Sequence, residues 1–398
     1  MAFGLYFMKS NSHAAAVCCE QPGTAFLLGS RRPDVSMLYV ISRALILWDT
    51  MNPTFLWVES QLPAGLIQVI QQLDSLENVK LPKNNVRFAL VDKETVQHAH
   101  ANAIAGACFS LGLRYAGTSC RSAYISIQHY LAHFYTLCVA CIENEQALGR
   151  QSNQLNSNDS IALSTTGQVY MLSDKQMARA AFIASAATEH TRELFQAVYA
   201  EARSLTYGFS AAIPTRKAIA MFLRPDWPVL EPCISATVVG LAMVMAGSGD
   251  FESLLVLLEF THVDASATYG FHMAIHMSIG LLFLGGGRAS LSRDRHSIAT
   301  LIAAFFPRFP THAEDNQYHL QPLRHLWSLA VVWRGLEVMD SDSGDVVVLP
   351  VTISMHTSVD WMLTFSPTIT LRAPCLLPPF QDVSAVAVES SRYVRTRT

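Results

Sequence analysis

The sequence predicts an all-α protein of stacked helix pairs, with a short β-rich segment near the C-terminal end. Two observations carry this prediction. Apolar residues make up 51% of the 398 residues and charged residues only 15%, against about 25% charged in an average soluble domain. The dipeptide Gly-Leu also recurs inside four apolar helical stretches, at Gly4, Gly112, Gly240 and Gly280. Helices that are apolar on nearly all sides need other elements packed around them.

The four Gly-Leu stretches share one pattern. An apolar run leads into the dipeptide, four or five residues follow, and a turn of small residues comes next. A shorter apolar stretch then predicts a second helix; the four are HAAAVCC, SAYISIQHYLAHF, FESLLVLLEF and HSIATLIAAFF. Weaker copies without the glycine lie at residues 42–50 and 322–330. The 40 residues between Gly240 and Gly280 are typical of the helix–turn–helix units that build α-solenoids.

The glycines have two expected roles in this unit. Gly240 and Gly280 lie just before the predicted helix ends, where a missing side chain lets a neighbouring helix approach closely. Glycine there costs up to about 1 kcal/mol of helix propensity relative to alanine, so we expect close packing to offset it. Asp250 is expected to cap the next helix and Pro307 to stop the last one. Positive φ values that reverse the chain are expected at Gly247, Gly249, Gly285, Gly286 and Gly287.

Two other segments differ from the repeats. Residues 143–229 are interpreted as an insertion: a polar run rich in Ser, Asn and Gln predicts a flexible loop, and a stretch of helical period then predicts an amphipathic helix. From Gly335 onward apolar and polar residues alternate around an Asp-Ser-Gly turn, which predicts strands. The predicted organisation is therefore helical repeats at 1–142 and 230–334, the insertion at 143–229, and a β-rich, partly irregular segment at 335–398.

The block from Gly240 to Val331 resembles a known family. The stretches LAMVMAGSGD, YGFHMAIHMSIGLLFLGGGRASLS and FPRFPTHAEDNQYHLQPLRHLWSLAV, with GLYFMKSN near the start, are similar to the proteasome/cyclosome repeats of the largest subunit of the anaphase-promoting complex. Weaker similarity covers residues 1–142. The resemblance implies a closed α–α toroid of two helical rings. Family members are several times longer, so it also implies that the chain corresponds to a piece of the subunit.

The resemblance implies a function as well: a non-catalytic scaffold in a ubiquitin ligase of the cell cycle and mitosis, in the nucleus and cytoplasm. The implied partners are the other subunits of the anaphase-promoting complex and its substrate-recruiting co-activators. A scaffold subunit of the proteasome regulatory particle is the alternative within the same repeat class, and HMSIGLLFLGGGR with DNQYHLQPLRHL favours the cyclosome subunit. Arg288, Arg293 and Arg295 are candidate exposed contacts.

No catalytic, cofactor-binding or metal site is predicted. His272 and His276 lie four residues apart, as in a zincin helix, but Met273 stands where that motif needs its catalytic glutamate. A second set, His129, His133, Cys138 and Cys141, has zinc-ligand side chains on what the sequence predicts to be one helix. At about 100° per residue, Cys138 lies opposite His129, so one helix cannot surround a tetrahedral ion. Core positions are predicted for the second set.

The remaining patterns exclude several other classes of function. Gly285–Gly287 with Arg288 lacks the preceding strand and the lysine of a phosphate-binding loop, so a helix-ending turn is predicted. No Ser/His/Asp or Cys/His arrangement is present. The net charge of −3 gives no support for nucleic-acid binding, and no small-molecule substrate is implied. Eight scattered cysteines without a disulfide framework indicate a reducing compartment.

A polytopic membrane protein is a further alternative. Residues 232–249 and 265–287 carry no charge and approach the length of about 20 residues that a membrane span requires. The second helices are too short for a span and carry Glu252, Glu259 or Arg295. Flanks rich in lysine or arginine, which would set an orientation, are missing from these segments. We therefore expect no membrane partner.

Overall fold

The computed structural model describes nine parts of the chain: residues 6, 12–20, 33–67, 93–135, 137, 225–261, 267–315, 321–356 and 368–388. All of them belong to one compact unit, formed by Met1–Leu137 and Thr215–Thr398. A second unit, Cys138–Pro214, lies outside the described residues. The predicted insertion at 143–229 and the first Gly-Leu pair, at Gly4, are therefore almost wholly outside the description.

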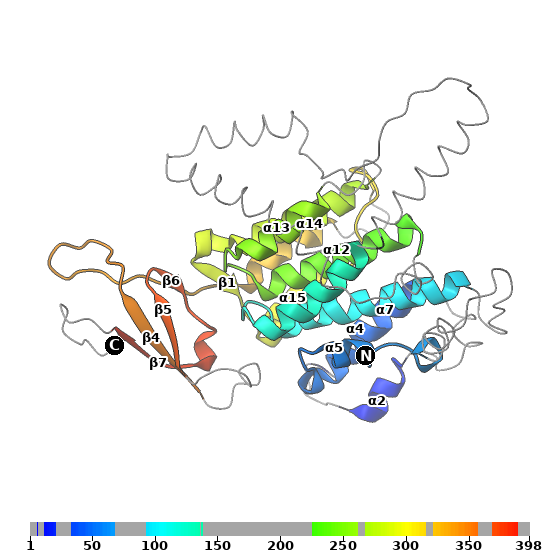
Figure 1. Cartoon of the computed structure of the whole chain (residues 1–398), viewed down its shortest axis with the longest axis horizontal. Helices are drawn as coiled ribbons and strands as arrows, with labels where there is room; N and C mark the ends of the chain where they lie inside the picture. The colour runs from blue at the N-terminus through cyan, green and yellow to red at the C-terminus, as the bar shows by residue number, and fades with distance from the viewer. Residues whose placement is uncertain are drawn as a thin grey trace, which may run out of the picture. The chain divides into compact units, whose positions relative to one another are not determined.

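Four helices form a row in which each helix packs on the next (Figure 1). They are α4 (Ser36–Ile46), α7 (Lys93–Arg114), α12 (Trp227–Val244) and α14 (Tyr269–Leu282). In α12 every residue from Cys233 to Val244 is buried. A helix that is apolar all round is stable in water only when other elements surround it, and α7 and α14 cover α12 from its two sides. The prediction of a mostly helical protein is confirmed.

Shorter helices pack on this row. The helix over residues 121–135 (the 121–135 helix) pairs with α13 (Phe251–Phe260). Arg121 forms a 2.9 Å ion pair with Glu252, and the hydroxyl of Tyr135 donates to Glu259 over 3.4 Å. Both glutamates thus serve contacts between helices. The remaining short helices are α2 (His13–Val17) beside α4 and α5 (Phe55–Glu59) beside α7.

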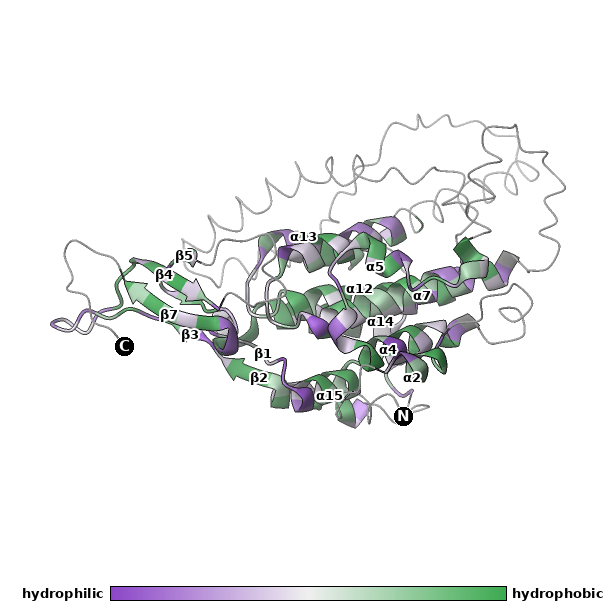
Figure 2. Ribbon diagram, turned by 90° about the horizontal axis from the view of Figure 1, so that it is seen from below, coloured by the Kyte–Doolittle hydropathy of each residue, from purple (hydrophilic) through white to green (hydrophobic). Residues whose placement is uncertain are grey.

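The end of the helical part departs from the predicted repeat. Helix α15 (Arg295–Ala304) packs on α7 and on η4 (Gln321–Ala330), and it lies on the opposite side of α12 from α13 (Figure 2). The predicted helix at 322–330 is a 3₁₀ helix. Four of its five less exposed residues, Gln321, Arg324, Trp327 and Ala330, are spaced by three, which matches the three residues per turn of a 3₁₀ helix.

Arg324 joins η4 to the end of α15. Its guanidinium is buried and donates to the carbonyl oxygens of Ala304, Phe306 and Arg308 over 3.0, 2.8 and 2.5 Å. These carbonyls lie at or just beyond the end of α15, where helix acceptors lack partners within the helix. The planar group also lies 4.3 Å from the ring centroid of Phe309. One side chain therefore caps α15 and orients η4.

The predicted β-rich segment is confirmed in the described residues. Strands β1 (Ala289–Leu291) and β2 (Val331–Trp333) pair antiparallel, as do β3 (Gly335–Leu336) and β6 (Cys375–Leu376). A three-stranded antiparallel sheet has the order β5-β4-β7, from β4 (Pro350–Met355), β5 (Thr368–Arg372) and β7 (Val383–Val388). Alternate residues of β4 are buried, which gives the sheet one apolar face with its own small core around Val351 and Ile353.

Candidate functional site

The turns after α7, α12 and α14 share two positions of positive φ, and the turn after α14 has a further one at Gly286 (63°). Each has a positive φ at the third and fifth residues beyond the helix. The pairs are Gly117 and Ser119 (64° and 53°), Gly247 and Gly249 (77° and 61°), and Gly285 and Gly287 (58° and 80°). The predicted positive φ of Gly247, Gly249 and the glycine triplet is confirmed. A turn was also predicted after the Gly112 stretch, but not its positive φ values, and Ser119 is a residue that rarely adopts this conformation.

Two of these turns donate hydrogen bonds to the end of the next helix in the row. The turn after α7 donates to the last residues of α12, and the turn after α12 donates to the last residues of α14. The four bonds run from Gly117 N to Met243 O (2.7 Å), Ser119 N to Val244 O (3.0 Å), Gly247 N to Leu281 O (2.8 Å) and Gly249 N to Leu282 O (2.9 Å). The last carbonyls of a helix have no partner within it, so each turn caps its neighbour.

A close crossing of α7 and α12 lies beside these turns. A Cβ added to Gly112 would lie 2.5 Å from the Cα of Gly240, and a Cβ added to Gly240 would lie 2.8 Å from the carbonyl oxygen of Cys108. Both distances are shorter than any normal carbon contact, so only glycine lets the two backbones approach this far. The expected role of Gly240 is confirmed.

The same expectation for Gly280 is wrong in the described structure. A Cβ added there would meet no atom within 4 Å, and the residue is exposed. Gly280 nevertheless occupies the position on α14 that Gly112 occupies on α7, two residues before the end of the helix. The reason for the difference is that no described helix crosses α14 on this side.

Arg334 fastens the β-rich segment to the turn after α7. Its guanidinium is 1% exposed and donates to the carbonyl oxygen of Gly117. Burial, and to a smaller extent the nearby Arg293, lowers the pKa of Arg334 to about 10. Its backbone N–H donates to Arg288 O over 2.8 Å and its carbonyl accepts from Leu377 N over 2.9 Å. The segment between β2 and β3 is thereby held against the helix ends.

The three arginines proposed as exposed contacts have different environments. Arg288 is 56% exposed and forms a 2.7 Å ion pair with Glu337. Arg293 is only 14% exposed and pairs with the buried Asp382 over 2.5 Å, so the expectation of an exposed Arg293 is wrong. The guanidinium of Arg295 lies 4.8 Å from the ring centroid of Tyr6. Of the three, Arg288 remains accessible to a partner.

The histidines do not come together as a metal site in the described part of the chain. No three His, Cys, Asp or Glu side chains there lie close enough to hold an ion. His133 is buried, as predicted, with its ring 5.9 Å from that of His100. Burial lowers the pKa of His133 to about 4 and that of His100 to about 3. His129 packs edge-on against Phe55 at 4.9 Å.

The other predicted metal-type residues are placed as follows. Cys138 and Cys141 lie outside the described residues. His272 and His276 lie on α14, with His276 exposed. Neither belongs to a described group of three ligand side chains.

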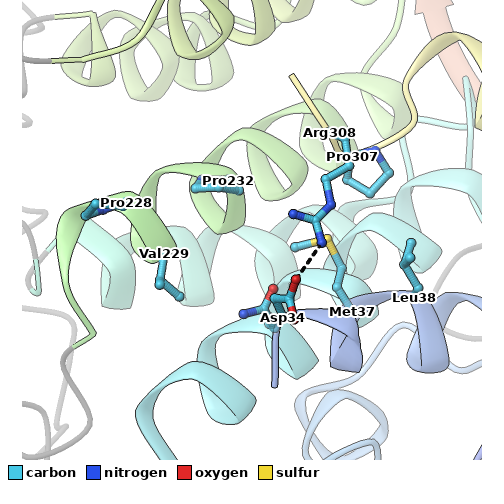
Figure 3. A pocket seen from close by; sticks show the side chains of 9 residues that line it. Asp34, Met37, Leu38, Pro228, Val229, Pro232, Pro307 and Arg308 are labelled. Atoms are coloured by element: carbon cyan, nitrogen blue, oxygen red, sulfur yellow. Dashed lines mark hydrogen bonds and ion pairs between the residues drawn. The ribbon is translucent and has the colours of Figure 1, made fainter. Parts of the chain in front are cut away.

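A small cavity lies where the start of α12 approaches α4 and α7 (Figure 3). Its volume is about 70 Å³, and three prolines, Pro228, Pro232 and Pro307, contribute to its wall. Asp34 and Arg308 form a 3.0 Å ion pair beside it. Pockets for small-molecule ligands usually have about 300–1,000 Å³, so this cavity is a packing gap rather than a substrate site.

Two helical stretches are long and apolar enough to cross a membrane by length and composition alone. The first is Trp227–Val244, where 78% of 18 consecutive residues are buried inside the protein. The second is Tyr269–Gly287, where 44% of 18 consecutive residues are buried. A core helix meets the same criteria. The burial of α12 between α7 and α14 accounts for its apolar composition without a membrane.

Comparison with known proteins identifies the class and then the family. The fold is that of a mostly α-helical protein with strands near its C-terminal end. The family model described as "APC1 fifth domain" matches residues 1–214 and 182–332. The chain therefore belongs to the family of anaphase-promoting complex subunit 1.

Several curated relatives match nearly the whole chain. Anaphase-promoting complex subunit 1 of Homo sapiens is 31% identical over 398 residues, which is 99% of this chain and 16% of the human protein. The Arabidopsis thaliana protein of the same name is 31% identical over 397 residues, 99% of this chain and 19% of that protein. A protein of Emericella nidulans named "Negative regulator of mitosis" is 28% identical over 396 residues, 99% of this chain and 14% of that protein. The chain thus spans less than a fifth of the length of these relatives.

Proposed function

We propose that this chain is a non-catalytic scaffold segment of the anaphase-promoting complex, a ubiquitin ligase of the cell cycle. The observation that carries the proposal is the match of 99% of the chain to relatives named anaphase-promoting complex subunit 1, in animals, plants and fungi. A subunit of a multi-subunit complex has other subunits as its partners. The alternative of a proteasome regulatory-particle scaffold has no support from the names of these relatives.

The way in which the described long helices use their buried hydroxyl groups supports the proposed scaffold role. Buried serines and threonines on the long helices donate to a carbonyl of their own helix, four residues earlier, rather than to a histidine or a carboxylate. The bonds, of 2.7 to 2.9 Å, are those of Ser110, Ser235, Thr237 and Ser278. Such a hydroxyl is committed to the backbone and is not activated as a nucleophile. The described polar groups thus support the fold.

We further propose that the helix pairs form part of a superhelix that closes into a toroid in the whole subunit. The repeated turns support this arrangement, because the turns after α7 and α12 each cap the next helix with the same pair of hydrogen bonds. A fixed relation between neighbours, applied again and again, generates a curved stack with one row of helices inside and one outside. Helix α13 and the 121–135 helix would belong to the outer row.

The proposed partners are the other subunits and the substrate-recruiting co-activators, which would dock on exposed helix ends and turns. Arg288 is the described candidate contact among the three arginines, since it is exposed beside the turn after α14. The net charge of −3 and the pairing of described acidic and basic side chains within the fold give no basic surface for nucleic acid. We propose a location in the nucleus and cytoplasm.

Affinity purification tests the proposal directly. The tagged protein is isolated from its own cells, and the co-purifying chains are identified by mass spectrometry. We expect subunits of the anaphase-promoting complex, and co-purification of proteasome regulatory-particle subunits instead would contradict the assignment. The purified chain should also transfer no ubiquitin by itself in a reconstituted assay, and transfer without partner subunits would refute a non-catalytic role. Fluorescent tagging checks the proposed location.

A further inference from the structure

Four arginines gather where the end of α7 meets the start of α15 and the β-rich segment. The chain segments that carry them are in contact: a Cβ added to Gly117 would lie 2.5 Å from the carbonyl oxygen of Leu291, and the side chain of Arg334 donates to Gly117 O. We call these four residues the arginine cluster: Arg114 at the end of α7, Arg293 and Arg295 around the start of α15, and Arg334 between β2 and β3.

The four guanidinium groups are within electrostatic range of one another. Burial lowers the pKa of Arg334, and the charge of Arg293 acts in the same direction. Burial also lowers the pKa of Arg293, where Arg114 adds to the effect and Asp382 opposes it. Burial raises the pKa of the phenol at position 6 to about 12, against the charges of Arg295 and Arg114. Each member of the cluster is therefore linked to another by its charge.

Few carboxylates compensate this positive charge. Arg293 pairs with Asp382 over 2.5 Å, and the charge of the same carboxylate acts on Arg334. Asp49 lies 3.9 Å from the guanidinium at the end of α7 but is 54% exposed, so solvent weakens that pair. Asp294 accepts from two backbone N–H groups at the start of α15, both over 3.0 Å. Two buried guanidinium groups thus share one buried carboxylate, an arrangement that leaves positive charge in the interior.

Four nitrogen atoms of the cluster are buried and have no hydrogen-bond acceptor among the described residues. Arg334 is 1% exposed; its Nη2 donates to Gly117, while its Nε and Nη1 have no partner. The other two atoms are Nε of Arg293 and Nη1 of Arg295. Leaving the donors of a buried charged group unpaired is costly, so the cluster favours an additional acceptor.

Arg324 shows how a core arginine of this protein is satisfied without a ligand. It is buried almost as deeply, at 4% exposed, but it donates to three carbonyl oxygens at the end of α15. Only its Nε is among the unpaired atoms of the described residues. The side chain of Arg334 has one such carbonyl and a second guanidinium beside it. Helix-end carbonyls therefore do not account for the arginine cluster.

We propose that the arginine cluster binds a phosphate group, either as the free ion or as a phosphate monoester. A phosphate group carries a charge of up to about −2 and at least three acceptor oxygens, which matches the excess positive charge and the four unpaired nitrogen atoms. A carboxylate brings one charge and two oxygens. Guanidinium groups bind phosphate oxygens in pairs. This site is independent of the proposed scaffold function.

The phosphate group reaches the cluster from the side of Arg293 and Arg114, whose side chains are 14% and 16% exposed. Bound there, it would link three parts of the fold: the end of α7, the start of α15, and the connection between β2 and β3. The β-rich segment would then be held on the helix ends by the anion as well as by the bond from Arg334 to Gly117.

The first test is titration calorimetry of the full 398-residue chain with sodium phosphate, at about pH 7 and an ionic strength held constant with sodium chloride. We expect one saturable site per chain. At a phosphate concentration of about 100 times Kd the melting temperature should rise by about 4 °C. The absence of a saturable site, or a melting temperature that follows ionic strength alone, would overturn the proposal.

Arg295→Met tests the site without disturbing a described bond. The side chain of Arg295 lies 4.8 Å from the ring centroid of Tyr6 and forms no hydrogen bond or ion pair with the described residues. Phosphate should bind at least about tenfold more weakly to this variant, with little change in melting temperature when phosphate is left out. Arg121→Met is the matched control, because Arg121 also lies over a tyrosine ring, that of Tyr124 at 4.7 Å. Equal affinities of the two variants would overturn the proposal.

Hydrogen exchange locates the site in the wild-type chain, which avoids relying on an Arg334 variant that can unfold. Phosphate should slow exchange in residues 114–119, 289–295 and 331–336 and leave α13 unchanged. Uniform protection, or protection elsewhere, would overturn the proposal. Repeating the calorimetry with O-phosphoserine distinguishes the two sources of the phosphate group. Binding as tight as that of inorganic phosphate supports a monoester, binding of inorganic phosphate alone supports the free ion, and binding of neither overturns the site.

Discussion

Replacing Gly112 by leucine should be one of the most damaging single changes in the helical part. The first carbon of the new side chain would lie 2.5, 2.6 and 2.9 Å from backbone atoms of Gly240, and the ordinary contact distance is 3.4–4 Å. Backbone cannot rotate away as a side chain can, so α12 must move by about 1 Å along much of its contact with α7. A gap of 0.5–1 Å forfeits about a quarter to a half of the dispersion energy of each contact.

The magnitude follows from two opposing effects. Leucine is favoured over glycine in a helix by about 0.8 kcal/mol, and overpacking a well-packed core costs about 1–3 kcal/mol. At a backbone-to-backbone crossing we expect the upper end of that range, hence a net loss of about 2 kcal/mol in the free energy of unfolding. For a folding unit as large as Met1–Leu137 with Thr215–Thr398, that loss lowers the melting temperature by about 3 °C.

Thermal unfolding followed by circular dichroism provides the assay, with urea unfolding as the second measurement. Gly280→Leu is the matched control: it gives the same change at the equivalent position of α14, but without a described atom nearby. We expect this control to melt at or slightly above the wild-type temperature in the isolated chain. If Gly112→Leu and Gly280→Leu shift the melting temperature equally, then the α7–α12 crossing does not determine the packing and the account given above is wrong.

Three further predictions concern buried charges. Arg324→Met removes three hydrogen bonds to carbonyls at the end of α15 and should cost more than about 2 kcal/mol of unfolding free energy; Arg324→Lys should not restore the loss in urea unfolding, because an ammonium cannot span the three acceptors. Asp382→Asn leaves the buried Arg293 without its counter-charge and should lower the free energy of unfolding by about 3 kcal/mol. Adding about 0.5 M salt to the wild type should not cause the same loss, because a buried ion pair is screened little by salt. The pKa values of His100 and His133 lie below the unfolded value of 6.5, at about 3 and about 4, so protonation favours the unfolded chain. The stability contributed by the two neutral histidines is complete above pH 6.5 and is lost as the pH falls from 6.5 toward 4. Between pH 7 and 5 we expect the free energy of unfolding to fall by roughly 2 kcal/mol per histidine. If the urea midpoint of a His133→Leu variant falls as steeply with decreasing pH as that of the wild type, this explanation is refuted.

The features predictable from sequence were those decided by neighbours along the chain. Asp250 caps α13 through a 2.8 Å bond from the Ser253 N–H, as its position before an apolar run predicted. The φ values of the glycine turns are a local property of residues without a side chain. The single antiparallel bridge between Met339 and Val346 likewise lies where alternation around a turn predicted pairing, although the described residues form no longer strand there. In these cases the physical cause lies within a few residues of the effect.

Features decided by distant residues were not predictable in this way. Gly240 and Gly280 both precede a leucine near the end of an apolar helix, yet Gly240 lies against the backbone of α7 and Gly280 meets no described atom within 4 Å. Arg288 and Arg293 are close in the chain, yet Arg293 is buried because Asp382, 89 residues later, lies against it. Arg324 of η4 donates to the carbonyl oxygens of Ala304 and Phe306, 20 and 18 residues earlier in the chain. Periodicity alone does not report such long-range contacts.

The bond between Arg334 and Gly117 has a consequence for how the protein is made. The two residues are 217 positions apart, and a ribosome adds about 5–20 residues per second. For roughly 10–40 seconds the turn after α7 is outside the ribosome while the arginine that completes it does not yet exist. Until residues 227–244 are made, the apolar flank of α7 has no α12 to cover it, so the nascent chain is exposed to aggregation during the first part of that interval.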